Sequence, residues 1–257
     1  MSKLLPPRFD THVKEAVRSF WRRRSDLSTT SQQGGRGSVI GGKNLDGFAQ
    51  LILKVALFCE VDPENIVVTG KSRLTIPGYF RPTKMWDSLV VYKGRLIAAF
   101  ELKSQVGPSF GNNFNNRTEE SIGSATDFWT AHRERAFESV RNIQDAPPIL
   151  AADGTKPPFL GYLMLLEECP RSISPVRVDE SHFKVFSEFV DSSYAKRYEI
   201  LLDRLVGEKL YSAASLILSN RLDGESRGVY RSPKDSLSPR SLFAEFAGRL
   251  LAAMEIF

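Results

Sequence analysis

Two apolar runs on either side of a short turn constrain this fold more than any other feature of the sequence. Residues 89–91 (LVV) and 96–100 (LIAAF) flank a Lys-Gly step at positions 93 and 94, a pattern typical of a β-hairpin. Three charged side chains, Asp87, Glu101 and Lys103, stand at its open end. Buried charges are expensive unless they are paired or hold a metal. This end is therefore either solvated surface or a site.

The length of the turn decides whether the two acids face each other. Side chains alternate along a strand, so Glu101 and Lys103 share one face. A two-residue turn would direct Asp87 to the opposite face, whereas a three-residue turn over residues 92–94 returns it to the face of Glu101. The site hypothesis predicts the longer turn, with positive φ at Gly94. A strict two-residue turn would count against it.

The acid pair has the chemistry of a magnesium site. Mg²⁺ takes one or two protein carboxylates and completes its shell with water and phosphate oxygens. A nearby ammonium stabilises charge on a phosphate or helps to orient the attacking water. Asp87, thirteen intervening residues and then Glu101-x-Lys103 resemble the nuclease arrangement PD-(D/E)xK. The alternative is an exposed strand end with a Glu-Lys pair.

The remaining chain predicts one α/β domain over residues 1–257, with a central mixed sheet flanked by helices. Helices are expected at residues 13–21, 45–59, 118–141, 183–190, 193–219 and 241–256, and further strands at 65–68, 73–76 and 159–166. Residues 105–117 are expected to form a polar loop. Mobile loops are expected near residues 28–43 and 221–240, which are rich in Gly, Ser or Arg.

Composition bounds the cellular setting and the class of partner. The net charge is +5 and the pI is about 9.2, which permits a polyanionic partner without requiring one. Cys59 and Cys169 follow no CxxC pattern and predict buried free thiols in a reducing compartment. With no signal peptide and no apolar run of about 18 residues, the expectation is a cytoplasmic protein.

Four stretches closely resemble the XhoI family of type II restriction endonucleases. They are residues 81–87 (RPTKMWD), 101–117 (ELKSQVGPSFGNNFNNR), 41–48 (GGKNLDGF) and 74–80 (LTIPGYF). The resemblance implies a restriction-endonuclease-like core and a homodimeric, Mg²⁺-dependent endonuclease that cuts double-stranded DNA at the palindrome CTCGAG after the first C. A separate cognate DNA methyltransferase would protect the host.

The resemblance also carries residues over by position. Asp87, Glu101 and Lys103 match the catalytic motif, although Trp86 stands where Pro often precedes the Asp. Superfamily members often place a further metal-binding acid on the helix before the sheet, and Asp46 is the candidate here. An Asp in the first turn of a helix also stabilises the helix dipole, so both interpretations of Asp46 stay open.

The expected DNA contacts lie on both sides of the motif. Arg81 and Lys84 are placed to meet phosphates near the cut, or are solvated strand-end charges. Asn pairs with adenine and Arg with guanine in the major groove. The candidates for such readout are Asn112, Asn113, Asn115, Asn116 and Arg117. The alternative is that these asparagines satisfy loop backbone and cap the following helix.

Three rival functions follow from the same residues. A structure-specific or repair nuclease of the same fold would share the metal site. A DNA-binding protein that has lost catalysis would bind without cutting, but the intact Asp87, Glu101 and Lys103 argue against it. A glycoside hydrolase that uses the two acids is a remote third choice, because Lys103 has no necessary part in that reaction.

Overall fold

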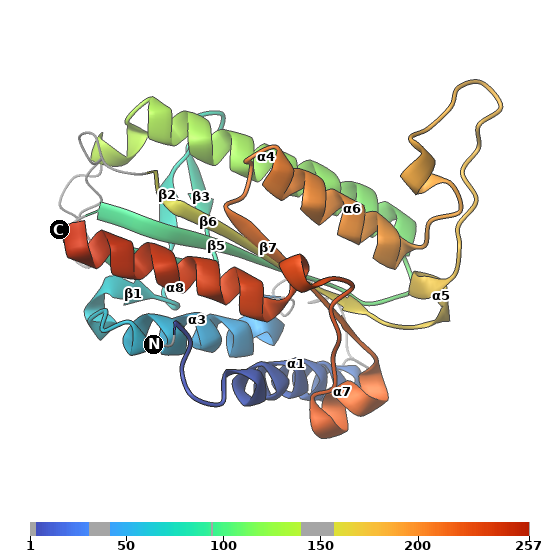
Figure 1. Cartoon of the computed structure of the whole chain (residues 1–257), viewed down its shortest axis with the longest axis horizontal. Coiled ribbons are helices and arrows are strands. Elements are labelled where there is room, and N and C mark those ends of the chain that lie inside the picture. The colour runs from blue at the N-terminus through green and yellow to red at the C-terminus, as the bar shows by residue number, and fades with distance from the viewer. Residues whose placement is uncertain (1–3, 31–41, 94, 140–156, 257) are drawn as a thin grey trace.

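A five-stranded mixed sheet forms the centre of the computed structural model, which describes residues 4–30, 42–93, 95–139 and 157–256 (Figure 1). The strand order is β1-β4-β5-β6-β7. β1, β4 and β5 are antiparallel neighbours, whereas β5, β6 and β7 are parallel. The five strands are β1 (Ile66–Val67), β4 (Ser88–Tyr92), β5 (Arg95–Gln105), β6 (Phe159–Glu167) and β7 (Ala213–Ser219). The expected α/β fold with a central mixed sheet is confirmed.

Helices cover both faces of this sheet (Figure 1). The α-helices are α1 (Phe9–Thr30), α3 (Asp46–Phe58), α4 (Phe110–Arg133), α5 (Pro170–Ile173), α6 (Tyr194–Gly207), α7 (Arg221–Arg227) and α8 (Pro239–Ile256). Short 3-10 helices span Gly42–Leu45, Pro63–Asn65, Ala136–Ser139, Ser187–Phe189 and Asp235–Leu237. α1, α3 and α8 pack on one face, and α4 and α6 on the other. Two hydrophobic cores result.

Alternation along β5 assigns its residues to these two cores. Phe100 and Leu102 lie in the core under α1, α3 and α8, where Phe100 contacts Phe246 with ring centroids 4.8 Å apart. Ala99 lies in the other core, on the face that α4 and α6 cover. Glu101 and Lys103 are in phase with Ala99, so they point toward α4. The expectation that they share a face, with Leu102 in the packing, is confirmed.

A second, two-stranded sheet stands beside the first. β2 (Thr75–Pro77) pairs antiparallel with β3 (Thr83–Met85), and Pro77 is opposite Thr83. β3 is followed directly by Trp86 and Asp87, which lead into β4. The β2–β3 hairpin is therefore tied through the chain to the start of the candidate site.

The polar loop expected at residues 105–117 is wrong, because α4 begins at Phe110 rather than near Thr118. Asn and Gly are weak helix formers, but packing overrides that preference here. Phe110 stacks on Tyr194, and Phe114, one turn later, meets Tyr198 edge to face. The asparagines consequently lie on the first turns of a helix.

Residues 193–219 do not form one helix. α6 ends at Gly207, and residues 213–219 form the buried strand β7. A short apolar run that is covered on both faces cannot be distinguished from buried helix by periodicity alone. The helix expected at residues 183–190 is also wrong, since only Ser187–Phe189 adopt a 3-10 turn.

The loop expected near residues 221–240 contains α7 and a 3-10 helix. The Asn220 side chain accepts a hydrogen bond from the Asp223 amide at the start of α7, and Gly228 ends it with φ of 68°. These are ordinary helix start and stop signals.

The loop expected at 28–43 falls mostly outside the described residues. Its described ends are helical, up to Thr30 and from Gly42. Within the described ranges no helix is long and apolar enough to cross a membrane.

Candidate active site

The β4–β5 hairpin brings the two acids together by a route that the sequence did not predict. Tyr92 pairs with Arg95, so the turn has two residues and the expected three-residue turn is wrong. Val91 then pairs with Leu96, but Val90 pairs with Ala98. Ile97 is therefore an extra residue in β5, and the register shifts there. This bulge reverses the phase and returns Asp87 to the face of Glu101. The positive φ expected at Gly94 lies outside the described residues.

Asp87 lies at the fork where β5 continues past the start of β4. Its backbone amide donates to the Phe100 carbonyl over 3.1 Å, and its Oδ2 accepts from the Leu102 amide over 2.8 Å. Burial raises the pKa of the Asp87 carboxyl, and the Leu102 amide and Lys103 oppose that shift. The carboxylate is thus fixed to the backbone of the neighbouring strand.

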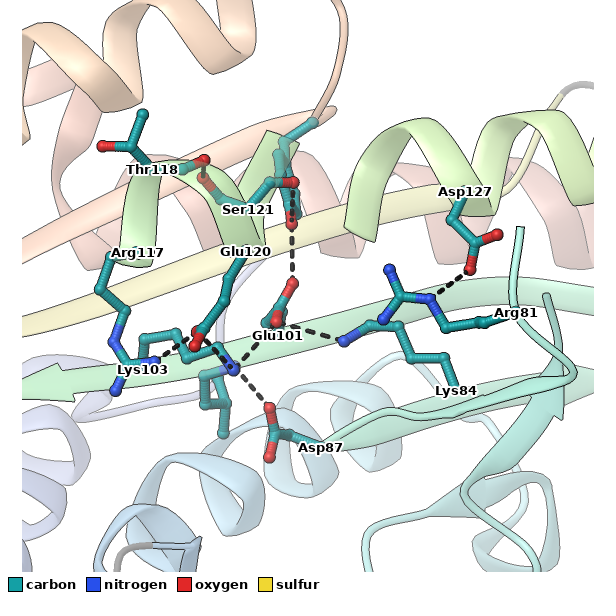
Figure 2. A network of polar contacts seen from close by, with 12 residues as sticks. Arg81, Lys84, Asp87, Glu101, Lys103, Arg117, Thr118, Glu120, Ser121 and Asp127 are labelled. Carbon is teal, nitrogen blue, oxygen red and sulfur yellow. Dashed lines mark hydrogen bonds and ion pairs between the residues drawn. The ribbon is translucent and has the colours of Figure 1, made fainter. Parts of the chain in front are cut away.

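Glu101 is the buried centre of the site (Figure 2). Its Oε1 lies 3.0 Å from the Lys103 Nζ and 3.3 Å from the Lys84 Nζ. Its Oε2 accepts a hydrogen bond from the Tyr211 hydroxyl over 2.8 Å. Burial alone would raise the pKa of Glu101, but the two ammonium groups and the hydroxyl outweigh it and lower the pKa. The carboxylate is therefore held ionised.

Lys103 connects the strand to helix α4. Its Nζ also lies 3.6 Å from Oε2 of Glu120, which Arg117 contacts through Nη1. Burial opposes the charge on Lys103, but Glu101 and Glu120 raise its pKa overall, so the side chain is an ammonium. Glu120 was not among the site residues predicted from the sequence, although the helix expected at residues 118–141 contains it.

Lys84 reaches the site from β3 rather than extending into solvent. Its side chain is 13% exposed, and its Nζ lies 4.6 Å from the ring centroid of Trp86. Trp86 is buried against Phe128 of α4, with ring centroids 5.2 Å apart. Trp86 therefore supports a second lysine on Glu101.

Two neighbouring buried tyrosines, which no sequence pattern singled out, lie beside Glu101. Tyr211 precedes β7, and its hydroxyl lies 2.8 Å from Glu101 and 3.2 Å from the Ser121 carbonyl. Tyr162 of β6 meets Tyr211 edge to face with ring centroids 5.0 Å apart. The buried Tyr162 hydroxyl has no hydrogen-bond partner among the residues that the structure describes.

Asp46 does not join the two acids. It begins α3, and its carboxylate contacts the Arg23 guanidinium of α1. Across the described ranges, no three His, Cys, Asp or Glu side chains form a group that could hold a metal. The structure therefore brings together Asp87, Glu101 and Lys103 but leaves Asp46 in a separate ion pair.

The predicted DNA contacts divide into those near the site and those further round α4. Asn113 and Asn116 each stand four residues before Arg117 and Glu120, respectively, so they share a flank of the helix with the residues that border Lys103. Asn112 and Asn115 are exposed, and neither stands three or four residues from Arg117 or Glu120.

Arg81 is half-exposed on the β2–β3 hairpin and is not a free strand-end charge. Its Nε lies 3.0 Å from Oδ2 of Asp127, a buried residue of α4 (Figure 2). Together with Lys84, Lys103 and Arg117, it completes a set of four cations beside Glu101 and below α4. Each of these cations is paired with Asp127, Glu101 or Glu120, so a polyanion that approaches the acid pair would compete with these carboxylates for them.

The chain is similar to known proteins of one family. A family model described as "Restriction endonuclease XhoI" matches residues 24–232, a range that contains every site residue named above. The type II restriction enzyme BstVI of Geobacillus stearothermophilus is 48% identical over 209 residues, which cover 79% of this chain and 85% of the relative. XhoI of Xanthomonas vasicola is 42% identical over 202 residues, which cover 77% and 75%. AbrI of Azospirillum brasilense is 43% identical over 183 residues, which cover 68% and 74%. No solved structure matches the chain.

Proposed function

Since the chain belongs to the family of the restriction endonuclease XhoI, we propose that it cleaves both strands of duplex DNA at a short palindrome. The proposed site is CTCGAG, cut after the first C, by Mg²⁺-dependent attack of water. The observation that carries this proposal is the convergence of Asp87, Glu101 and Lys103 on one face at the fork of β4 and β5.

The donor set fits Mg²⁺. Two carboxylates from adjacent strands supply hard oxygen ligands, and Mg²⁺ is commonly held by one or two carboxylates together with water and phosphate oxygens. Asp87 and Glu101 would hold the ion. Asp46 would have to leave Arg23 before it could contribute. When bound, Mg²⁺ would polarise the scissile phosphate and lower the pKa of a water molecule.

The protein's own residues have separate tasks in this reaction. The Leu102 amide fixes Asp87, and the Tyr211 hydroxyl orients Glu101, so both carboxylates are set before DNA arrives. Lys103 is an ammonium beside Glu101, and we assign it to stabilising the negative charge that develops on the phosphate. Glu120 orients Lys103 from the α4 side.

DNA binding is assigned to the cations and amides that border the acids. Arg81, Lys84 and Arg117 would contact phosphates on either side of the cut. Asn113 and Asn116 share their helix flank with Arg117 and are the first candidates for base contacts, followed by Asn112 and Asn115. A palindromic site is matched by a two-fold dimer in which each subunit cuts one strand. A separate methyltransferase and a cytoplasmic location complete the proposal.

The experiment that tests this function is digestion of DNA of known sequence by the purified protein, with Mg²⁺ or with a chelator, followed by mapping of the ends. Discrete fragments that end at CTCGAG, formed only with Mg²⁺, are expected. Cleavage confined to junctions or flaps would favour a structure-specific or repair nuclease of this fold. Tight binding without cleavage would indicate a DNA-binding protein.

A further inference from the structure

Two aromatic side chains stand exposed at the tip of the β2–β3 hairpin. Tyr79 is 54% exposed and Phe80 is 68% exposed, and their rings meet edge to face with centroids 5.0 Å apart. Water contact with two large apolar rings is unfavourable. Single exposed apolar residues are common on protein surfaces, but two adjacent aromatic rings at one tip are a candidate contact surface.

The tip is fixed from below by a buried carboxylate. Oδ1 of Asp127 accepts hydrogen bonds from the backbone amides of Tyr79 and Phe80, over 2.8 and 2.7 Å. Its Oδ2 pairs with Arg81 of the same tip. A Cβ atom at Gly78 would lie 2.6 Å from the Arg81 carbonyl oxygen, so the turn closes tightly only with glycine there. The rings are thus presented in a set position.

The same hairpin borders the acid pair. β3 carries Lys84, whose Nζ lies 3.3 Å from Oε1 of Glu101, and Asp87 follows Lys84 three residues later in the chain. Arg81 at the tip and Lys84 on β3 carry two basic side chains toward the acids, where they pair with Asp127 and Glu101 (Figure 2). A partner that draws Arg81 and Lys84 from these acids and also covers the exposed rings would offer both anionic groups and apolar surface. Duplex DNA has both properties, in its phosphates and in the bases that line its grooves.

We propose that Tyr79 and Phe80 enter a groove of the bound duplex beside the scissile phosphate and pack against its bases. The proposal rests on the proposed function and adds an apolar contact to the charged contacts already assigned. Asp127 is a positioning residue in this scheme, because it sets the rings before DNA binds and lowers the ordering cost of the complex.

The test measures binding of a CTCGAG duplex by fluorescence anisotropy, in a Glu101→Ala background in which the duplex is not cut. Adding Phe80→Ala or Tyr79→Ala should weaken binding about tenfold, because each removes an apolar ring that packs against the bases in the groove. The matched control is Phe183→Ala, which removes an equally exposed ring (68%) from the segment between α5 and α6 and should leave binding unchanged.

Three results would overturn the proposal. They are unchanged binding by both aromatic variants, an equal loss in the Phe183→Ala control, and a loss that follows dissociation of the protein into monomers in sedimentation velocity. The last would make the tip a contact between two copies of the chain. If the wild type cuts duplex DNA while the aromatic variants bind normally, only this inference fails. A wild type that neither binds nor cuts duplex DNA overturns the proposed function as well.

Discussion

The Tyr211 hydroxyl donates a 2.8 Å hydrogen bond to Oε2 of Glu101, which precedes it by 110 residues. Both side chains are buried, and the bond occupies the carboxylate oxygen that the two lysines leave open. A hydrogen bond to a charged group contributes about 1.5–3 kcal/mol and is directional. Tyr211 therefore fixes the rotation of the Glu101 carboxylate.

Replacing Tyr211 with Phe removes only this hydroxyl. The variant should lose about 1–3 kcal/mol of unfolding free energy, because a buried carboxylate oxygen loses its donor. It should also need more Mg²⁺ for half-maximal cleavage, since the carboxylate is no longer held in one orientation. Denaturant unfolding and a Mg²⁺ titration of the cleavage rate measure the two effects.

The matched control is Tyr162→Phe. It removes a neighbouring buried hydroxyl that has no hydrogen-bond partner within the part of the chain that the structure covers. This variant should keep its Mg²⁺ requirement and should not lose stability. Equal Mg²⁺ requirements for Tyr211→Phe and wild type would show that Tyr211 is structural only.

Lys84 and the divalent ion should compete for Glu101. The Lys84 Nζ lies 3.3 Å from Oε1, the oxygen that also faces Lys103. Replacing Lys84 with Met keeps an unbranched apolar side chain and removes the charge that faces both Glu101 and the Trp86 ring. Without DNA, the variant should bind Mn²⁺ about fivefold more tightly, equivalent to about 1 kcal/mol. Isothermal titration calorimetry measures this affinity directly.

Lys54→Met controls for the loss of one positive charge. The Lys54 Nζ lies 3.8 Å from Glu15, on the opposite face of the sheet from α4. Its substitution should leave Mn²⁺ affinity unchanged. Weaker metal binding by Lys84→Met would contradict the competition and would indicate that Lys84 supports the metal site.

The Asp127 carboxylate should control the order of the hairpin tip. In Asp127→Ala, the amides of Tyr79 and Phe80 lose their acceptor, so they should exchange with solvent faster than in the wild type. Hydrogen exchange of a peptide that covers residues 78–82 measures this change. Asp127→Asn keeps an acceptor oxygen and should retain most of the protection. Equal exchange in all three proteins would show that Asp127 does not hold the tip.

The part of the site that could be predicted is the part that lies within one hairpin. The two-residue period places Glu101 and Lys103 on one face, and the apolar runs place Asp87 at the same end. The bulge at Ile97 could not be predicted, because the sequence around it is uniformly apolar and alternative registers bury similar surface. The sequence therefore predicted the correct face for Asp87, but on the basis of a three-residue turn that the structure does not have.

The contacts that complete the site come from distant segments. Tyr211 reaches Glu101 only because residues 213–219 form a strand beside β6, and that segment has the same apolar composition as a buried helix. Glu120 approaches Lys103 from α4, whose first turns form a helix because Phe110 and Phe114 pack on α6. In both cases tertiary packing decided between two local structures that the sequence allowed.

The most direct test of the acid pair is the single-turnover cleavage rate of a CTCGAG duplex by Glu101→Gln and Asp87→Asn, at saturating Mg²⁺ and with DNA affinity measured in parallel. Both substitutions conserve size and remove one carboxylate charge. The rate should fall about a thousandfold or more, because several kcal/mol of charge stabilisation depend on the metal, while DNA affinity changes little. Cleavage at the wild-type rate by either variant would contradict the assignment of Asp87 and Glu101 as the metal-binding pair.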